Sequence, residues 1–424
     1  MKSTSNRLAT GSLASAGLAL LSLHTAFAQD AAPPPAPDTG NNAWMLTSTA
    51  LVLFMTIPGL ALFYGGLVNR RNVLSVLMHC FSLAAVLSVV WMILGYTLTM
   101  GEPGGLIGGL GMAFHRGVGP DKILMSAFQM TFFIITPALI VGTFVERIKF
   151  SSMLVFSVLW ALLVYAPVCH ITWFGGIFQQ WGVIDLAGGI VVHITAGVAA
   201  LVACIMVGKR QHPEPPHNLP MTVTGTAMLW VGWFGFNAGS QGGASDAAAM
   251  TLFVTHLSAA TAACVWAAIE WFTVKKPSVL GAVTGSIAGL AAITPASGVA
   301  GPLGAMLIGT VSGIVCWWAS VKLKNRLRYD DSLDVVGVHG VGGVVGTILA
   351  AVVGLKALGG YGDFEFGKQM GLQLAAAGIT AVYTGVVTIG ILAVVKAVMG
   401  LRVSEIDETV GLDQSAHGET AYND

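Results

Sequence analysis

Eleven apolar stretches, each close to twenty residues long and separated by polar segments, run through the sequence and constrain its fold more than any other feature. A bilayer core of about 30 Å is spanned by a helix of roughly 20 apolar residues. Only 9% of the residues are charged, compared with about 25% in soluble domains. The expected spans are residues 44–68, 73–98, 122–145, 151–170, 187–208, 219–240, 251–273, 278–294, 302–323, 335–355 and 370–399. We therefore predict an all-α membrane protein with eleven transmembrane helices embedded in a lipid bilayer.

The start of the chain has the pattern of a secretory signal peptide. Lys2 and Arg7 form a basic start, residues 14–23 form a short apolar core, and Ala26-Phe27-Ala28 forms a small-residue cleavage site. We expect a signal peptide at 1–28, a periplasmic linker rich in Pro and Ala at 29–43, an eleven-helix domain at 44–401 and a polar cytoplasmic tail at 402–424. Cleavage would leave the mature N-terminus outside the cell membrane.

The distribution of lysine and arginine tests this orientation independently, because cytoplasmic loops retain basic residues. One set of alternate loops, together with the tail, carries Arg70, Arg71, Arg147, Lys149, Lys209, Arg210, Lys275, Lys276, Lys322, Lys324, Arg326, Arg328, Lys396 and Arg402. The other set carries Arg116, Lys122, Lys356 and Lys368. The richer set should face the cytoplasm. We expect a bacterial inner-membrane protein with its mature N-terminus in the periplasm and its C-terminus in the cytoplasm.

Two similar segments indicate an internal repeat. Asp185 is followed by seven residues and His193, and Asp331 is followed by seven residues and His339. Because five spans separate the two copies, the second must cross the membrane in the opposite direction, as in inverted-topology repeats whose functional site lies near the bilayer midplane. We predict a 5+5 inverted repeat with one extra helix. Eight residues of helix rise about 12 Å, so each histidine should approach the midplane from its own side.

Histidine inside a membrane is costly and is by default a candidate functional residue. A single one could equally be a hydrogen-bonded packing residue, but the repeat favours a facing pair formed by His193 and His339. His79 and His256 have no repeat-related partner and are interpreted as structural or vestibule residues, whereas His170 is compatible with either role.

Three motifs, in order, carry a resemblance to a known family. They are Asp185-x-Ala-Gly-Gly-x-x-Val-His193, Trp233-Phe-Gly-Phe-Asn-Ala-Gly-Ser240, and the run from Asp331 to Gly343 that contains His339. The sequence resembles the Amt/Mep/Rh ammonium transporters, and bacterial Amt channels most closely. The resemblance implies an outer ammonium site, a stacked phenylalanine gate and a twin-histidine pore. The site residues implied are Phe128, Phe132, Trp173 and Ser240 with support from Asp185, the gate residues are Phe132 and Phe236, and the pore residues are His193 and His339.

Helical spacing supports this placement. Phe128 and Phe132 are four residues apart near the outer end of one expected helix, and Phe236 and Ser240 are four apart at the outer end of another, so each pair shares a face. Trp173 is expected in the adjoining outer loop. The alternative for the aromatic residues alone is an interfacial belt.

The expected chemistry is ammonium recognition followed by passage of ammonia. Cation–π contact with Trp and Phe is worth about 0.5–1 kcal/mol when exposed and 2 or more when desolvated, and the Ser240 hydroxyl can accept a hydrogen bond. A bare ion pays heavily to enter an apolar lumen, so ammonium should lose its proton near the gate. His193 and His339 would then line the path of ammonia and relay the proton. Whether transport is electrogenic stays open.

Two features leave alternatives open. Asp185 can cap backbone N–H groups at its helix start as well as shape the field of the outer site. The polar tail has a composition typical of disorder, but the pattern between Gly411 and Tyr422 resembles the bacterial Amt tail. That resemblance implies docking on the cytoplasmic face, a trimeric PII-type regulatory partner and a homotrimer of the chain itself.

Other functions are weighed against the channel. One is an ammonium sensor that signals through its tail, and another is conduction of a different neutral molecule such as carbon dioxide or methylamine. An intramembrane metal enzyme using the two histidines lacks carboxylate or cysteine ligands at metal spacing; we expect no enzyme, no metal and no cofactor. The net charge of zero and the scattered basic residues argue against nucleic acid as a partner.

Overall fold

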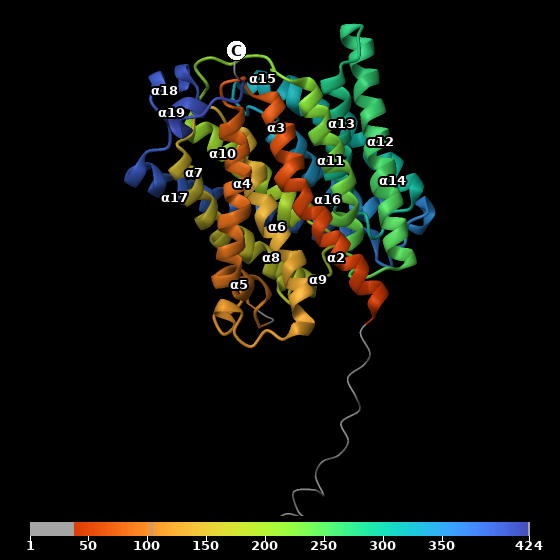
Figure 1. The fold of residues 1–424 in the computed structure, drawn as a ribbon. Helices are drawn as coiled ribbons and strands as arrows, with labels where there is room; N and C mark the ends of the chain where they lie inside the picture. Colours follow the sequence, from red (N-terminus) through yellow and green to blue (C-terminus); the bar gives the residue numbers. More distant parts are fainter. Residues whose placement is uncertain (1–37, 103–104, 423–424) are drawn as a thin grey trace, which may run out of the picture. The chain divides into compact units, whose positions relative to one another are not determined.

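The computed structural model describes residues 38–102 and 105–422, and these residues form a helical bundle (Figure 1). The expected signal peptide and most of the expected linker, residues 1–37, lie outside the described residues. We call residues 402–422 the tail, the end of the bundle against which they pack the tail side, and the opposite end the distal side. In Figure 1 the tail side is at the top, and α5, α8 and α9 lie toward the distal side.

The first half of the chain contains α2 (Thr39–Phe54), η1 (Met55–Leu60), α3 (Ala61–Leu67), α4 (Val73–Val90), η2 (Trp91–Gly95), α5 (Tyr96–Met100), η3 (Ala113–His115), α6 (Pro120–Phe144), α7 (Phe150–Trp160), η4 (Ala161–Tyr165), α8 (Ala166–Trp173), α9 (Ile177–Trp181), η5 (Gly189–Ile194) and α10 (Thr195–Val207). The second half contains α11 (Leu219–Gly239), α12 (Asp246–Val274), α13 (Val279–Ile293), α14 (Pro302–Trp317), η6 (Trp318–Leu323), α15 (Lys324–Leu327), η7 (Val336–Gly340), α16 (Val341–Val353), η8 (Lys356–Leu358), α17 (Phe366–Met399), α18 (Glu405–Val410) and α19 (Leu412–His417).

Every expected span overlaps a helical segment. Within the described residues, nine continuous helices are long and apolar enough to cross a membrane, and α13 adds a shorter apolar helix of 15 residues. The remaining expected span corresponds to α11, which has 21 residues and is not among the nine. Over the residues that the structure describes, the chain is therefore an all-helical membrane protein with nine to ten apolar helices. Eleven crossings and the 5+5 repeat stay predictions.

Polar side chains and prolines set the starts of several helices. Asn218, Ser245 and Ser278 accept hydrogen bonds from backbone N–H groups in the first turns of α11, α12 and α13. Such caps satisfy N–H groups that have no partner inside the helix. Proline occupies the first turn of α6, α11 and α14, where its missing N–H costs nothing.

Six short segments among the described residues, η1, η2, η4, η5, η6 and η7, are π-helical and lie within or at the start of longer helices. π-helical turns are rare and occur frequently at functional sites. Two of them carry the repeat-related histidines: η5 contains His193 and η7 contains His339.

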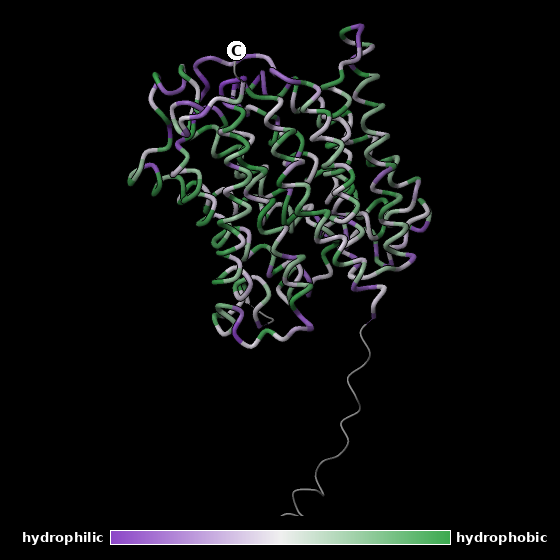
Figure 2. Tube along the Cα trace, viewed as in Figure 1, coloured by the Kyte–Doolittle hydropathy of each residue, from purple (hydrophilic) through white to green (hydrophobic). Residues whose placement is uncertain are grey.

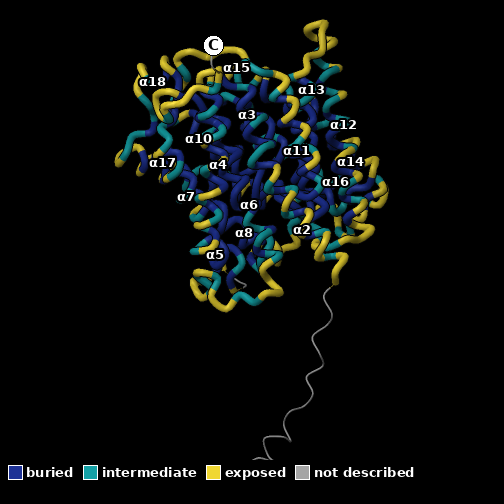
Figure 3. The backbone as a smooth tube through the Cα atoms, viewed as in Figure 1, coloured by how far each residue is buried: buried dark blue, intermediate teal, exposed yellow. Residues whose placement is uncertain are grey.

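Polar residues gather on the tail side, whereas the helices between the two ends are mainly hydrophobic (Figure 2). Figure 3 shows buried backbone through the middle of the bundle and exposed backbone at its ends and on its outer helices. Apolar side chains are also exposed along single helices, for example Val382, Val386 and Val394 on α17. Exposed apolar surface along helices of this length fits a lipid or protein environment rather than water.

The tail is folded against the bundle, contrary to the disorder that its composition alone favours. The Asp413 carboxylate accepts the backbone N–H of Ser75 at 2.7 Å, and Asn72 accepts the backbone N–H of Leu412 at 2.8 Å. Glu408 accepts hydrogen bonds from Arg402 at 2.6 Å and from the backbone of Gln211 at 2.7 Å. Intramolecular contacts thus supply the order that local composition does not.

A buried ionic cluster lies beside the tail. Arg210 forms ion pairs of 2.9 Å with both Glu146 and Asp330. The guanidinium of Arg147 is fully buried and donates to backbone carbonyls and to Ser332. Burial by itself raises the pKa of the Asp330 carboxyl, but the hydrogen bonds and charge of Arg210 outweigh it and hold that pKa below its ordinary value.

Candidate functional site

The two repeat-related histidines meet inside the bundle. The imidazole Nδ1 atoms of His193 and His339 are 3.3 Å apart, and the rings are nearly parallel with centroids 5.2 Å apart. Both side chains are buried. A hydrogen bond between two Nδ1 atoms requires one to carry a proton and the other to accept it, so the two rings adopt complementary protonation.

Glycines next to the histidines allow this contact. A Cβ atom on Gly197 would lie 2.1 Å from the Cα of Gly340, so only glycine permits α10 and η7 to approach this closely. A Cβ on Gly343 would similarly lie 2.8 Å from the Cβ of His193. Small residues at such crossings let membrane helices bring their backbones together.

A column of aromatic rings extends from His193 toward the distal side. Phe236 lies 6.2 Å from the His193 ring, and Phe132 contacts Phe236 at 4.3 Å with the planes tilted by 31°. Phe128 follows at 5.1 Å from Phe132, and Trp173 meets Phe132 edge-on at 5.9 Å. Phe128, Phe132 and Phe236 are buried, whereas Trp173 is only half-buried. The Phe132–Phe236 contact therefore closes the column below a more accessible tryptophan.

Trp173 contacts the distal part of the column, and Ser240 follows the end of α11, one turn beyond Phe236. Trp173 is the last residue of α8, so its expected position in a loop is wrong: the helix extends to this residue and ends just after it. Its indole N–H donates to the backbone carbonyl of Asp185 at 2.7 Å, which fixes the ring plane. The Ser240 hydroxyl donates to the carbonyl of Phe236 at 2.8 Å, so its oxygen keeps lone pairs for a donor ligand.

Asp185 caps the helix that bears His193. Its carboxylate accepts the backbone N–H groups of four residues, Gly188, Gly189, Ile190 and Val191, at 2.6–3.2 Å. Burial raises the pKa of this carboxyl to about 6, and the four hydrogen bonds act against that rise. Asp331 has a smaller role of the same kind at η7, where it accepts the N–H of Val336 at 2.8 Å.

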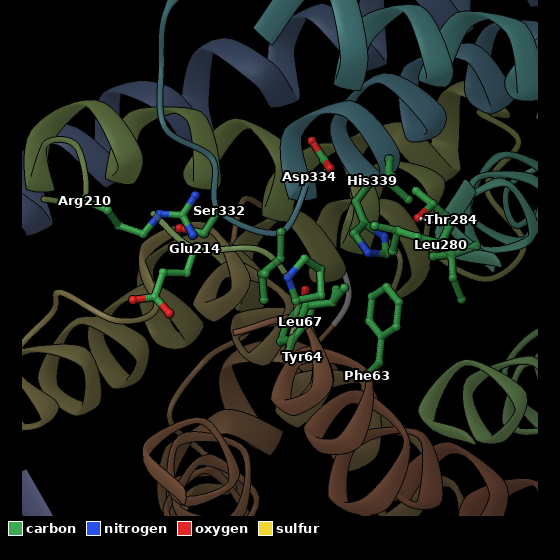
Figure 4. A pocket seen from close by; sticks show the side chains of 14 residues that line it. Phe63, Tyr64, Leu67, Arg210, Glu214, Leu280, Thr284, Ser332, Asp334 and His339 are labelled. Carbon is green, nitrogen blue, oxygen red and sulfur yellow. Dashed lines mark hydrogen bonds between the residues drawn. The ribbon is translucent and has the colours of Figure 1, made fainter. Parts of the chain in front are cut away.

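Two cavities adjoin the histidine pair. The narrower has a volume of about 10 Å³, close to the minimum that one water-sized molecule needs. It is lined by Met55, Leu60, Phe63, Ile135, Leu139, Val192, His193, Leu229, Trp233, Phe236, Ile287 and His339. The wider cavity, of about 190 Å³, reaches toward the tail side and also includes His339 (Figure 4). Its lining adds polar groups from Arg210, Glu214, Ser332 and Asp334.

Ring contacts and hydrogen bonds join seven of the eight residues that the sequence assigned to the site, the gate and the pore, and Ser240 lies one helical turn beyond Phe236 at the end of α11. The three other histidines considered in the sequence analysis lie elsewhere. His79 stacks on Phe150, His170 contacts the carbonyl of Thr99, and His256 packs against Trp230. In the part of the chain that the structure describes, no group of three His, Cys, Asp or Glu side chains is arranged to hold a metal ion.

Sequence reasoning missed two contributors. The Trp233 ring lies 5.5 Å from that of His193, and its N–H is bound by Thr294 at 2.9 Å. The glycine contact between Gly197 and Gly340 was also missed, although each glycine lies within four residues of a pore histidine, which is the signal that could have identified it.

A membrane-embedded helical bundle, with a buried line of aromatic and imidazole rings leading from one side to a polar cavity on the other, defines the class of membrane transporters and channels for small solutes. The model of the Ammonium Transporter Family matches residues 43–422. The chain belongs to the ammonium transporter family, and its activity is therefore transport and not catalysis.

Close relatives and solved structures agree. The ammonium transporter of Bacillus subtilis is 45% identical over 401 residues, which cover 91% of this chain and 99% of that protein. The ammonium transporter of Aquifex aeolicus is 43% identical over 418 residues, covering 95% and 98%. A solved "Sensor Amt Protein" aligns with a TM-score of 0.84 at 28% identity over 89% of this chain and 98% of the other. Saccharomyces cerevisiae Mep2 gives 0.79 at 33% identity, covering 87% and 88%.

Proposed function

We propose that the chain takes up ammonium at the distal aromatic site, removes its proton near Phe132 and Phe236, and passes ammonia between His193 and His339 toward the tail side. One observation carries the proposal. The narrow cavity is apolar along its whole lining except for the two imidazoles and the indole N–H of Trp233, which is already bound by Thr294.

Recognition at the distal end rests on π faces and one acceptor. Trp173 offers a half-buried ring, Phe128 and Phe132 lie behind it, and the Ser240 oxygen keeps lone pairs. Ammonium donates four hydrogen bonds, whereas potassium of similar size donates none. The hydroxyl therefore favours ammonium, and the rings attract any small cation by about 0.5–2 kcal/mol.

Deprotonation follows from the cost of carrying a charge through this lining. An ion that passes the Phe132–Phe236 contact gives up its water and receives few new ligands, which is unfavourable by many kcal/mol. Neutral ammonia loses far less. The wider cavity beyond His339 contains ionisable groups and space for water, and ammonia can regain a proton there.

The histidine pair supplies a route for the proton. The Nδ1–Nδ1 contact of 3.3 Å allows a proton to move from one ring to the other. Because the rings hold complementary protonation, transfer at one end favours transfer at the other. In this mechanism each ammonia is accompanied by one proton, and transport is electrogenic.

The test is ammonium-evoked current in proteoliposomes. Wild type should give a current that saturates with ammonium, and His193→Ala and His339→Ala should each abolish it while isotopic ammonia flux persists. Thr388→Val serves as the control because it removes a buried hydrogen bond to Trp160, away from the pore. An undiminished current in both histidine variants contradicts the relay.

The orientation of the chain in the membrane is inferred from the distribution of basic residues. We propose that the tail side faces the cytoplasm of a bacterial inner membrane and the distal side faces the periplasm, because basic residues concentrate in the loops of the tail side. Cysteine introduced at Asp246 at the distal start of α12 should react with an impermeant maleimide added outside intact cells, and cysteine introduced at Lys324 should not.

Assembly as a homotrimer is supported by one surface feature. His256 is exposed on α12, ten residues into a membrane-spanning helix, and a polar ring is costly when it faces lipid. A neighbouring copy of the chain would cover it. Native mass spectrometry of the purified protein should give three copies, and a monomer that is active in liposomes argues against the trimer.

We propose a PII-type regulatory protein as a partner that binds at the tail. The tail folds beside Arg71 and Glu214, and Glu214 also lines the wider cavity, so a protein bound there would cover the exit. Titration of proteoliposomes with a purified bacterial PII protein should reduce the current. A protein that binds with no effect on the current contradicts a blocking role.

Sensing through the tail is the second candidate. It is favoured by the likeness to a solved "Sensor Amt Protein" and by the extensive contacts of the tail with α4 and with the segment after α10. Deleting residues 402–424 separates the two functions. Retained flux together with loss of an ammonium-dependent response in cells supports sensing, and retained flux with an unchanged response contradicts it.

A further inference from the structure

The long helix α17 lies outside the expected repeat but sends a glutamine into the interior next to the distal site. The Gln373 side chain is fully buried. Its oxygen accepts the backbone N–H of Ile184 at 2.8 Å, and its nitrogen donates to the carbonyl of Ile184 at 2.8 Å and to that of Thr347 at 2.9 Å. Gln369, one turn earlier, donates to the same oxygen at 3.1 Å and to the carbonyl of Gly182 at 3.0 Å.

All hydrogen-bonding positions of the Gln373 amide are therefore used. An amide has two N–H donors and an oxygen with two lone pairs, and each of these has a hydrogen-bond partner here. The amide pairs with both backbone groups of Ile184, as a neighbouring strand would. Few side chains can do this, because the task requires an acceptor and two donors at one place.

The segment held by Gln373 is the one that supports the distal site. Ile184 immediately precedes Asp185, whose carbonyl accepts the indole N–H of Trp173 and whose carboxylate caps η5. On its other side the segment is anchored by Leu186, whose N–H donates to the carbonyl of Pro295 at 3.1 Å. Gln373 thus fixes one edge of a short segment, and Trp173 takes its orientation from that segment.

We propose that Gln373 is a positioning residue for the distal cation site: it holds the Ile184 backbone, and through Asp185 it sets the plane of the Trp173 indole. The inference rests on the proposed role of Trp173 in binding ammonium. It assigns a function to α17 beyond crossing the membrane, because this helix becomes the outer support of the site. The hydrogen bonds of Gln373 go to Ile184, Thr347 and Gln369, and none of these is a residue of the aromatic column.

The first variant is Gln373→Leu, which keeps a side chain of roughly similar size and removes every hydrogen bond of the amide. Backbone groups of Ile184 and the Thr347 carbonyl then lose a buried partner, and the segment shifts. The expected result is a rise of about tenfold in the ammonium concentration giving half-maximal current. The maximal current per folded protein should change much less, because the histidine pair is untouched.

The second variant, Gln373→Glu, has nearly the same shape and gives a pH-dependent result. An ionised carboxylate faces two carbonyl oxygens and repels them, whereas a protonated carboxyl restores the acceptor and one donor. Relative to wild type at each pH, the half-saturating ammonium concentration should fall toward that of wild type as the assay goes from about pH 8 to about pH 5. A role in general packing does not produce this trend.

Thr388→Val is the matched control, since it removes a buried hydrogen bond between α17 and Trp160 of α7 that does not touch the distal segment. It should leave half-saturation unchanged. The proposal is overturned if Gln373→Leu has wild-type half-saturation, or if Thr388→Val raises it equally. Failure of the proton relay can be told apart from failure of this proposal. The relay is tested by whether His193→Ala and His339→Ala abolish the current, whereas this proposal is tested by the ammonium concentration that gives half-maximal current.

Discussion

Gly197→Ala is the substitution whose effect can be worked out most directly from the structure. The added methyl group would lie 2.1 Å from the Cα of Gly340, and this neighbouring atom belongs to the backbone, which cannot rotate away. Ordinary van der Waals contact begins at 3.4 Å. The two backbones must therefore separate by roughly 1.3 Å before the contact becomes tolerable.

That separation is large on the scale of the histidine pair. His193 lies four residues before Gly197, and His339 immediately precedes Gly340, so the rings move with the backbones. Their Nδ1 atoms are now 3.3 Å apart, and an added separation of about 1 Å takes them beyond hydrogen-bonding distance. Overpacking of this kind also costs about 1–3 kcal/mol of stability.

The assay is ammonium-evoked current in proteoliposomes, normalised to the amount of folded protein, with the melting temperature measured in parallel. We expect the current to fall by about tenfold or more, because a loss of 1.4 kcal/mol in the proton step already gives a factor of ten. Gly378→Ala on α17 is the control, since no atom lies within 4 Å of its added methyl. A Gly197→Ala protein with wild-type current and melting temperature would refute the reasoning.

Three further predictions follow from the site and its surroundings. Asp185→Asn should keep part of the transport, because an amide oxygen can still accept the N–H groups of Gly188 and Gly189. Since burial raises the pKa of Asp185 to about 6, the wild-type protein should lose stability as pH rises from about 4 to about 6, and the melting temperature of the variant should vary less with pH over this range. Arg210→Gln should lower the melting temperature at pH 7, because it removes the ion pair with Asp330. The pKa of Asp330 is depressed in the folded state, so the stabilisation from this ion pair is present above about pH 4 and is lost on further acidification, where the difference in melting temperature between variant and wild type should shrink. Phe236→Ala removes the ring that contacts both Phe132 and His193 and should admit potassium, measured as current without ammonium; an unchanged, ammonium-only current contradicts a gating role.

The placement of the helices could be predicted from the sequence because hydrophobic length is a strong local signal. The relation between His193 and His339 was also accessible, since the spacing to Asp185 and Asp331 is the same in both segments. The aromatic residues were placed by their four-residue spacing and by the family resemblance. Each of these signals is a local spacing or motif, and the pairing of His193 with His339 came from the repetition of one local spacing at two distant places.

Features that depend on distant contacts could not be predicted in this way. The end of α8 at Trp173 was misplaced by three residues because apolar length alone does not fix where a helix ends, whereas in the structure the Trp173 indole is anchored by the backbone carbonyl of Asp185. The ordered tail depends on Asn72 and Ser75, which lie more than 300 residues away. The role of Gln373 depends on a partner 189 residues distant, and a single glutamine in an apolar helix gives no sign of it.

The π-helical geometry around the two histidines has a consequence for insertions and deletions. A π-turn is an α-helix that has gained one residue, so η5 and η7 each contain one position that an uninterrupted α-helix would not need. Deleting a single residue between Gly189 and His193 would therefore let the turn relax to the α form while the residues on either side keep nearly their present orientation. A single-residue deletion in an ordinary α-helix rotates one side against the other by about 100°, whereas here a deletion would regularise the helix and leave Asp185 at its start.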